Sequence, residues 1–227
     1  KHLKRIATPK TWNILRKAQT FITRPNAGAH SLTHALSLNT IVKEDINLAN
    51  TTKEVKRILK EQEVLVDGKR RHDEKFNVGF MDVIDFPKIK KAYRIGFSEK
   101  GKLQAFEVPA KEEALKIIRI IGKKSVAKGK TQLQFSDGRT LLLNKDAYAV
   151  GDSLLLTIPT QEIKEHLALK KGAQVVVYKG KYTGTQGTLE EIEGNSVFLK
   201  TKNGSIHTKK QYAYVMGDKK TAIKCSP

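Results

Sequence analysis

The clearest helical pattern of hydrophobic and polar residues lies near position 50. Apolar residues at positions 55, 58 and 59 repeat at the spacing of one helix face. Thr51 stands three residues before Glu54, which is the spacing of a capping box. The pattern therefore predicts a helix that begins here, with Thr51 or Thr52 as its N-cap.

Weaker helical patterns occur on either side of this segment. Short helices are expected at residues 11–19, with Thr11 as the cap, and from Ser31 through about residue 38. A short helical insert is expected at residues 110–115, and a basic, flexible loop at residues 122–130.

Alternating apolar and polar residues predict strands over most of the remaining chain. The turns Asp67-Gly68 and Ser136-Asp137-Gly138 contain Asp-Gly pairs, which favour tight hairpins. The strand candidates are Glu63–Val66, Phe80–Phe86, Tyr93–Phe97, Leu103–Val108, Thr131–Phe135, Arg139–Leu143, Ser153–Ile158, Val175–Tyr178, Gly187–Ile192, Val197–Thr201 and Ser205–Thr208.

These patterns divide the chain into five segments and favour an α+β, multi-domain fold. Residues 1–30 are expected to form a basic N-terminal arm, and residues 31–91 a small α/β module. Residues 92–168 are typical of a central β-rich domain, either a small barrel or a sandwich. Residues 169–217 suit a five-stranded, SH3-like barrel, and residues 218–227 form a short polar tail without a predicted fold.

The charge of the chain indicates a polyanionic partner. Its 227 residues include 43 Lys and Arg against 23 Asp and Glu, which gives a formal net charge of +20. Self-repulsion at this level weakens a compact state unless a polyanion neutralises it. Nucleic acid is the usual polyanion, and the pI near 9.9 is typical of domains that bind it. The alternative is a basic soluble protein without such a partner.

The basic residues are concentrated at the two ends. Residues 1–43 contain eight Lys or Arg, and the first carboxylate of the chain is Glu44. Residues 169–227 contain eleven Lys or Arg against four Asp or Glu. The middle of the chain has the charge balance of an ordinary globular protein.

The remaining composition argues against several classes of protein. Cys225 is the only cysteine, so an internal disulfide and a thiolate metal site are excluded, as is usual in a reducing cytosol. No apolar run has the roughly 18 residues of a membrane span, and residues 1–5 lack the apolar stretch of a secretory signal. His30 and His34 have i,i+4 spacing, but the arm supplies no further metal ligands. We therefore expect a soluble, intracellular protein without metal or cofactor.

Basic side chains in several segments are the candidates for contact with RNA. They are Lys4, Arg5, Arg16, Lys17 and Arg24 in the arm, Lys53, Lys56 and Arg57 on the predicted helix, Lys69, Arg70 and Arg71 after the Asp-Gly turn, Lys123 and Lys124 in the expected loop, and Lys179 and Lys181 near the C-terminus; Gly184, beside the last two, is a candidate through its backbone. Cations on the helix and hairpin are expected to converge on one surface. The alternative for each set is a solvated surface.

The arm has two possible states. In one, the arm becomes ordered only when it binds RNA, where its ammonium groups contact phosphates and its rings stack on bases. In the other, the arm packs on the body of its own protein. Trp12 is accordingly either a base-stacking residue or part of a small local core.

Two stretches carry a resemblance to known families. Lys171 to Glu190 is similar to a KOW motif: a strand, a glycine turn, a basic loop with Lys179 and Lys181, and a second strand entered through glycine. Glycines at 184 and 187 are expected to permit positive φ and close approach of an RNA backbone. Ser31 to Phe86 resembles the S-four type of RNA-binding module, with residues 64–69 at its strand and turn.

The order of these parts resembles the S-four-e family of small-subunit ribosomal proteins from archaea and eukaryotes. A basic arm with Pro9-Lys10-Thr11-Trp12 precedes the S-four-like module, and Gly79 to Ile84, a β-rich region and the KOW unit follow it. The resemblance implies a cytoplasmic structural protein that binds ribosomal RNA and neighbouring ribosomal proteins, without cofactor, small-molecule substrate or self-association. The compact length and short tail are more typical of archaeal members.

Two other functions were considered. One is a KOW-containing transcription or translation factor that binds RNA transiently. The other is an RNA-modifying enzyme such as a pseudouridine synthase, whose Gly-Arg-Leu-Asp motif carries the nucleophile. The nearest match is Gly138-Arg139-Thr140-Leu141, which lacks the Asp. Residues 122–125 have the Gly-Lys-Lys-Ser order but no upstream glycine of a phosphate-binding loop. We therefore expect a non-enzymatic RNA-binding protein.

Overall fold

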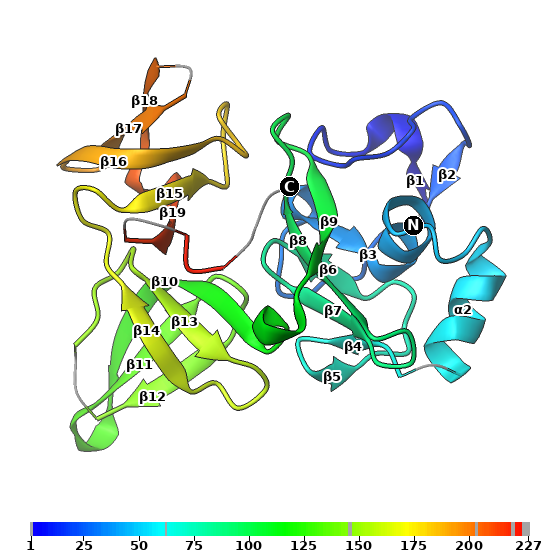
Figure 1. Cartoon of the computed structure of the whole chain (residues 1–227), viewed down its shortest axis with the longest axis horizontal. Helices are drawn as coiled ribbons and strands as arrows, with labels where there is room; N and C mark the ends of the chain where they lie inside the picture. The colour runs from blue at the N-terminus through cyan, green and yellow to red at the C-terminus, as the bar shows by residue number, and fades with distance from the viewer. Residues whose placement is uncertain (1, 62, 145–146, 203, 219–220, 224–227) are drawn as a thin grey trace. The chain divides into compact units, whose positions relative to one another are not determined.

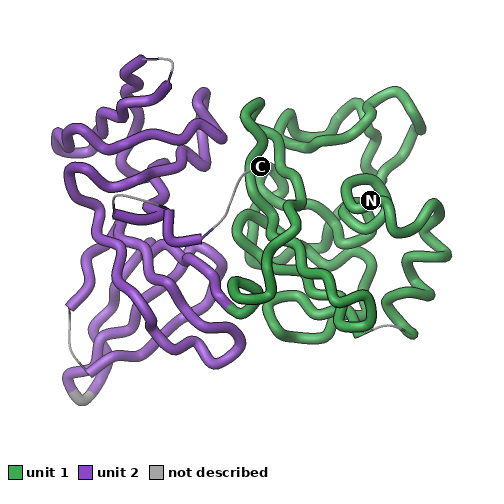
Figure 2. The backbone as a smooth tube through the Cα atoms, viewed as in Figure 1, with its two compact units in different colours: residues 1–114, 225–227 green, residues 115–224 purple. Residues whose placement is uncertain are grey.

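The computed structural model describes residues 2–61, 63–144, 147–202, 204–218 and 221–223, and it divides into two compact units (Figure 2). Unit 1 extends to Ala114, and unit 2 starts at Leu115. Both consist mostly of β-sheet with few helices (Figure 1). Helices therefore make up a smaller share of the fold than the predicted α+β class suggests.

Unit 1 contains a five-stranded antiparallel sheet (Figure 1). Its strands, in spatial order, are β5 (Lys69–Arg70), β4 (Leu65–Val66), β7 (Val83–Phe86), β8 (Lys91–Phe97) and β9 (Leu103–Val108). The hairpin predicted at Asp67-Gly68 is confirmed, and the expected strands β8 and β9 pair with each other in a further hairpin.

This sheet joins strands from two of the expected segments, residues 31–91 and 92–168. The segment around Pro87, which separates them in the sequence, is the turn of a hairpin between β7 and β8. The N–H of Ile89 donates to the carbonyl of Phe86, and that of Lys90 to Pro87. A turn that looks like a domain boundary in the sequence thus continues one sheet.

The helix predicted after Thr51 is confirmed as α2 (Thr52–Glu61). The helix expected over residues 31–38 is wrong. Its residues form a 3-10 turn, Leu32–His34, and then strand β3 (Ala35–Ser37), which pairs with β6 (Asn77–Gly79). Because residues 35–37 pair with β6, the helix begins only at Leu38, as α1 (Leu38–Thr40). The Ser37 hydroxyl caps it by accepting a hydrogen bond from the Thr40 N–H.

A π-helical segment and several 3-10 turns complete the helical structure. The π-helical segment Ile41–Asp45 follows α1 directly. The other 3-10 turns are Arg5–Ala7, Ala110–Glu112, Ala127–Gly129 and Lys210–Tyr212.

The basic N-terminal segment packs on the body of unit 1. Strand β1 (Leu3–Lys4) pairs with β2 (Phe21–Ile22), and the helix expected at residues 11–19 is absent. The Trp12 indole is buried and donates to the carbonyl of Leu32 at 3.0 Å, while the Leu103 N–H donates to the Thr11 carbonyl at 2.7 Å. These long-range bonds replace a local helix, and Trp12 belongs to a local core.

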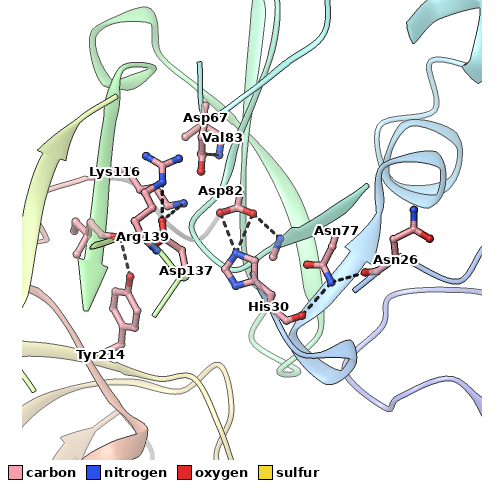
Figure 3. A network of polar contacts seen from close by, with 12 residues as sticks. Asn26, His30, Asp67, Asn77, Asp82, Val83, Lys116, Asp137, Arg139 and Tyr214 are labelled. Carbon is pink, nitrogen blue, oxygen red and sulfur yellow. Dashed lines mark hydrogen bonds and ion pairs between the residues drawn. The ribbon is translucent and has the colours of Figure 1, made fainter. Parts of the chain in front are cut away.

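A buried polar network fixes the end of this segment (Figure 3). His30 Nε2 lies 3.0 Å from a carboxylate oxygen of Asp82, which also accepts the Gly79 N–H at 2.8 Å. The Asn77 amide donates to the carbonyls of His30 and Asn26. His30 therefore has a structural partner in Asp82, which lies in the turn between β6 and β7.

Unit 2 contains two five-stranded antiparallel sheets (Figure 1). The strands of the first are β12 (Thr140–Leu143), β11 (Lys130–Phe135), β10 (Leu115–Val126), β13 (Ser153–Thr157) and β14 (Ile163–Leu167). The strands of the second are β18 (Gly204–Lys209), β17 (Ser196–Thr201), β16 (Gln186–Glu193), β15 (Gln174–Val177) and β19 (Ala213–Gly217).

The long strand β10 corrects two predictions. The helical insert expected at residues 110–115 is only the 3-10 turn Ala110–Glu112, because Leu115 already pairs with Thr157. The loop expected at residues 122–130 is strand as far as Val126, since it pairs with β11. Strands β14 and β19 were not predicted.

Part of the C-terminal segment expected to be an unfolded tail is attached to the second sheet. The Gln174 N–H donates to the Asp218 carbonyl, and the Ala222 N–H to that of Met216. Residues 219–220 and 224–227, including Cys225, lie outside the described residues.

Tyr214 of β19 joins the two sheets of unit 2 (Figure 3). Its buried hydroxyl donates to the carbonyl of Ile117 in β10 at 2.7 Å. Burial raises the pKa of this phenol far above its usual range. Close by in Figure 3, the buried ammonium of Lys116 lies 3.2 Å from Asp137, which also faces Arg139. Within the described residues, every helix is too short or too polar to cross a membrane.

Candidate nucleic-acid interface

The exposed face of α2 carries four cations. Val55 and Leu59 bury the opposite face against the body of unit 1, so the remaining positions point to solvent. The Thr51 hydroxyl accepts the Glu54 N–H at 3.2 Å, and the Glu54 carboxylate accepts the Asn50 N–H at 2.8 Å. The first bond confirms the predicted capping box. The bond from Asn50 above all, together with the Thr51 hydroxyl that donates to the Glu54 carboxylate at 2.9 Å, lowers the pKa of Glu54. The cations are Lys53, Lys56, Arg57 and Lys60.

The hairpin of β4 and β5 presents a second basic group. Asp67 and Gly68 both have positive φ, as the tight turn predicted from the sequence requires. The buried Asp67 carboxylate accepts the Val83 N–H at 3.0 Å, which fixes the turn to β7. Lys69 and Arg70 follow on β5 with exposed side chains.

Two hydrogen bonds bring separate hairpins to the C-terminal end of α2. Arg70 donates to the carbonyl of Lys60 at 3.2 Å, and Lys88, from the turn between β7 and β8, donates to that of Glu61 at 2.6 Å. The last carbonyls of a helix carry partial negative charge and favour cations at this end. One surface therefore combines the helix with both turns.

The Lys-rich turn between β7 and β8 adds cations that the sequence interpretation missed. Its exposed side chains are Lys88, Lys90 and Lys91. The run Pro87-Lys88-Ile89-Lys90-Lys91 is the sequence signal for these cations, but the same run is also typical of a domain boundary.

Five of the nine cations on this surface have no counter-charge among the described residues. Lys56, Arg57, Arg70 and Lys91 each lie within 4 Å of a carboxylate, in pairs that are largely exposed and weak. The cations that form no ion pair with any described residue are Lys53, Lys60, Lys69, Lys88 and Lys90. Arg71, by contrast, is half-buried and lies over the ring of Phe76, 4.3 Å from its centroid.

The candidates in the arm fall into two groups. Arg5 is buried, pairs with Glu44 and donates to the Leu15 carbonyl at 2.9 Å. Arg16 donates to the carbonyls of Ile6, Thr8 and Pro9 at 2.9–3.2 Å. Both guanidinium groups are thus engaged within unit 1. The exposed members of the arm set are Lys4, Lys17 and Arg24.

In unit 2, the candidates lie on β10 and after β15. Lys123 is half-buried and donates to the Tyr148 carbonyl, whereas Lys124 is exposed. Lys179 and Lys181 share one turn, and each ammonium lies over a neighbouring tyrosine ring, at 5.1 and 5.5 Å from the centroids.

Only one of the two glycines expected to have positive φ does so. Gly184 has φ of +88°, as predicted. Gly187 is not among the residues with positive φ; a Cβ there would lie 2.6 Å from the Lys200 carbonyl oxygen, so this position needs glycine for contact between β16 and β17. Across the described part of the chain, no cluster of three His, Cys, Asp or Glu side chains is arranged to hold a metal ion.

Family models match most of the chain. A model described as "Ribosomal family S4e" matches residues 89–163, an "S4 domain" model matches residues 38–84, and an "RS4NT (NUC023) domain" model matches residues 1–33.

Curated relatives are similar over nearly the whole length. The small ribosomal subunit protein eS4 of Methanosphaera stadtmanae is 38% identical, over 98% of this chain and 95% of that protein. The eS4 proteins of Archaeoglobus fulgidus and Methanocaldococcus jannaschii are 37% and 35% identical; the alignments cover 96% and 99% of this chain, and 94% and 97% of those proteins. The crystal structure of the 30S ribosomal protein S4e from Thermoplasma acidophilum superposes with a TM-score of 0.71 at 28% identity, covering 82% of this chain and 96% of that one.

Proposed function

This chain belongs to the S4e family of ribosomal proteins, and on that premise we propose that it is a structural constituent of the small ribosomal subunit that binds ribosomal RNA. Its function is binding, with no catalysed reaction and no cofactor. Its partners are the small-subunit ribosomal RNA and neighbouring ribosomal proteins, and its location is the cytoplasmic ribosome.

The gathering of exposed cations around the C-terminal end of α2 carries this proposal. Lys60 and Lys69 lie on separate elements, and Arg70 and Lys88 attach both hairpins to the helix end. Cations held at fixed spacing bind successive phosphates and release the counterions of the RNA. Such a surface recognises the shape of a folded RNA backbone rather than a linear sequence.

Other cations extend the binding surface. The exposed ones are Lys4, Lys17 and Arg24 in the arm, Lys124 on β10 and Lys181 after β15, and the half-buried Lys179 lies beside Lys181. We assign the sheet from β15 to β19 to the KOW barrel expected from the sequence; its antiparallel order and basic turn support this assignment. Arg5, Arg16 and Trp12 hold the arm in shape through their internal hydrogen bonds.

A pair of double variants tests the surface on α2. Replacing Lys60 and Lys69 by Gln should weaken binding to small-subunit ribosomal RNA and reduce the slope of log affinity against log salt by about 2, one for each phosphate contact. The matched control replaces Lys100 and Lys102, in the turn at the other end of β8, and should leave the slope unchanged. Filter binding over a salt series measures both.

The proposal fails if the two double variants lose the same affinity, or if the wild-type protein does not retain ribosomal RNA at near-physiological salt. Reconstitution into small subunits, followed by a moderate-salt wash on a sucrose gradient, separates a structural constituent from a transient factor. A structural constituent stays with the subunit, and a transient factor washes off.

A further inference from the structure

A groove of about 730 Å³ lies in unit 2 where its two sheets meet. One wall comes from the middle of β10, with Arg119, and from the turn before β13, with Gly151. The other comes from the segment after β15, with Lys179, and from the 3-10 turn Lys210–Tyr212. The Lys210 side chain packs beside Gly151, because a Cβ at that glycine would lie 3.6 Å from the Lys210 Cε. The groove has the size of a small-ligand site.

Positive charge lines this groove. Arg119, Lys179 and Lys210 contribute cations, and none of the described residues lining it is acidic. The neutral lining includes the rings of Tyr178 and Tyr212.

Arg119 differs from the other buried cations that the structure describes. Arg5, Arg94 and Lys116 each pair with a carboxylate. Arg119 is only 6% exposed, yet its side chain forms no hydrogen bond or ion pair with any described residue, and its Nε is fully covered without a partner. Burial of an uncompensated charge is strongly unfavourable, so this guanidinium calls for an anionic ligand.

Tyr212 supplies a ring beside these cations. The ring packs against Gly180, whose φ is +92°. A Cβ at this glycine would lie 3.3 Å from two carbons of the ring, so the absence of a side chain there allows the close contact. The Tyr178 N–H donates to the Tyr212 carbonyl at 3.1 Å, which fixes the turn next to β15. Aromatic rings beside cations bind unpaired nucleotides, because the ring stacks on a base while the cations hold the phosphate.

We propose that this groove binds an unpaired nucleotide of the RNA, with its phosphate held by Arg119, Lys179 and Lys210 and its base stacked on Tyr212. The inference rests on the proposed function, since it names one element of the RNA that the protein recognises. A guanidinium binds phosphate oxygens in bidentate geometry. Duplex RNA keeps its bases stacked inside, so an unpaired strand fits Tyr212 better.

Binding of a labelled single-stranded RNA hexamer to the full chain, measured by fluorescence anisotropy over a salt series, tests this site. Tyr212→Leu should weaken hexamer binding about tenfold and leave binding of a duplex hairpin unchanged. Lys210→Gln should reduce the salt slope for the hexamer by about 0.7, the value for one phosphate of a single strand. Lys200→Gln, at an exposed lysine of β17, is the matched control and should change neither.

Arg119→Met separates ligand binding from a structural role. The substitution removes an uncompensated buried charge, so the melting temperature of the free protein should stay the same or rise while hexamer affinity falls. A lower melting temperature with unchanged affinity would show that Arg119 serves the fold and would overturn its role here.

The remaining outcomes distinguish this site from the wider function. Hexamer affinity equal to wild type in all three groove variants, with ribosomal RNA still bound, overturns the groove alone. Failure of the wild-type protein to bind ribosomal RNA overturns the proposed function itself. If the groove variants lose binding of a glutamate hexapeptide instead of the RNA hexamer, the ligand is an acidic protein segment and the nucleotide assignment is wrong.

Discussion

Gly79 has no room for a side chain, because the imidazole of His30 lies against it. A Cβ at this position would lie 2.3 Å from the ring, and the ring is held by Asp82. Gly79→Ala should therefore lower the free energy of unfolding by about 3 kcal/mol through overpacking. Urea denaturation measures the loss. Gly122→Ala is the control, because Gly122 has no positive φ and a Cβ there would meet, at 3.0 Å, only the flexible end of the Gln134 side chain; an equal loss there would contradict the steric explanation.

Asp45 makes stability depend on pH. Burial raises the pKa of its carboxyl from 3.8 to about 6, although the hydrogen bond from the Ala105 N–H acts in the opposite direction. The folded chain therefore holds this proton more tightly than the unfolded chain does. The stabilisation that comes from this bound proton is complete below about pH 4 and is lost as the pH rises through 6.

Asp45→Asn should remove this penalty. At pH 7 the free energy of unfolding of the variant should be higher by on the order of 2 kcal/mol. Its stability should also decrease less between pH 4 and pH 6 than that of the wild type. Some decline remains, because burial and the nearby Glu113 also raise the pKa of Asp85 to about 6. Denaturation curves from pH 4 to pH 7 test this, and an unchanged slope would refute it.

Strand β10 depends on a buried ion pair with the turn between β11 and β12. The side chains of Lys116 and Asp137 are 1% and 4% exposed and lie 3.2 Å apart. Asp137→Asn removes the carboxylate charge facing Lys116 and should cost about 3–5 kcal/mol. Replacing Lys116 by Met in the same chain should recover most of this. The interpretation would be wrong if the double variant were less stable than Asp137→Asn.

Elements with strong local signals were predictable from the sequence. The Asp-Gly pair at Asp67 forms the expected hairpin, and the capping box at Thr51 and Glu54 starts α2. The larger part of the basic surface around α2 was predictable for the same reason. Its other part, at Lys88, was missed because a hairpin turn and a domain boundary have the same composition.

Elements that depend on distant partners were not predictable. The pattern of β10 is obscured because Lys116 and Arg119 are charged residues in buried positions, and the partner Asp137 is remote in sequence. Arg5 looked like an RNA contact, since nothing near it in sequence shows that it pairs with Glu44, 39 residues away. Local propensity also gave a helix at Trp12, where long-range packing prevails.

The net charge of +20 affects the stability of the whole molecule. Mutual repulsion of the exposed cations opposes folding, and salt screens it over a distance that shrinks from about 10 Å at 0.1 M to about 3 Å at 1 M. The melting temperature of the free protein should therefore rise between 50 and 500 mM KCl, whereas affinity for ribosomal RNA falls over the same range. A melting temperature that decreases with KCl would contradict this account.

The order of strands in the second sheet of unit 2 also bears on synthesis. Strand β15 lies between β16 and β19, so one edge of its apolar segment Val175–Val177 stays open until residues 213–217 have left the ribosome that makes them. Exposed apolar edges recruit other strands, and domains generally fold in the order in which they emerge. A nascent chain stalled before β19 should thus be prone to aggregation, and chaperones that cover strand edges should be most effective during that interval.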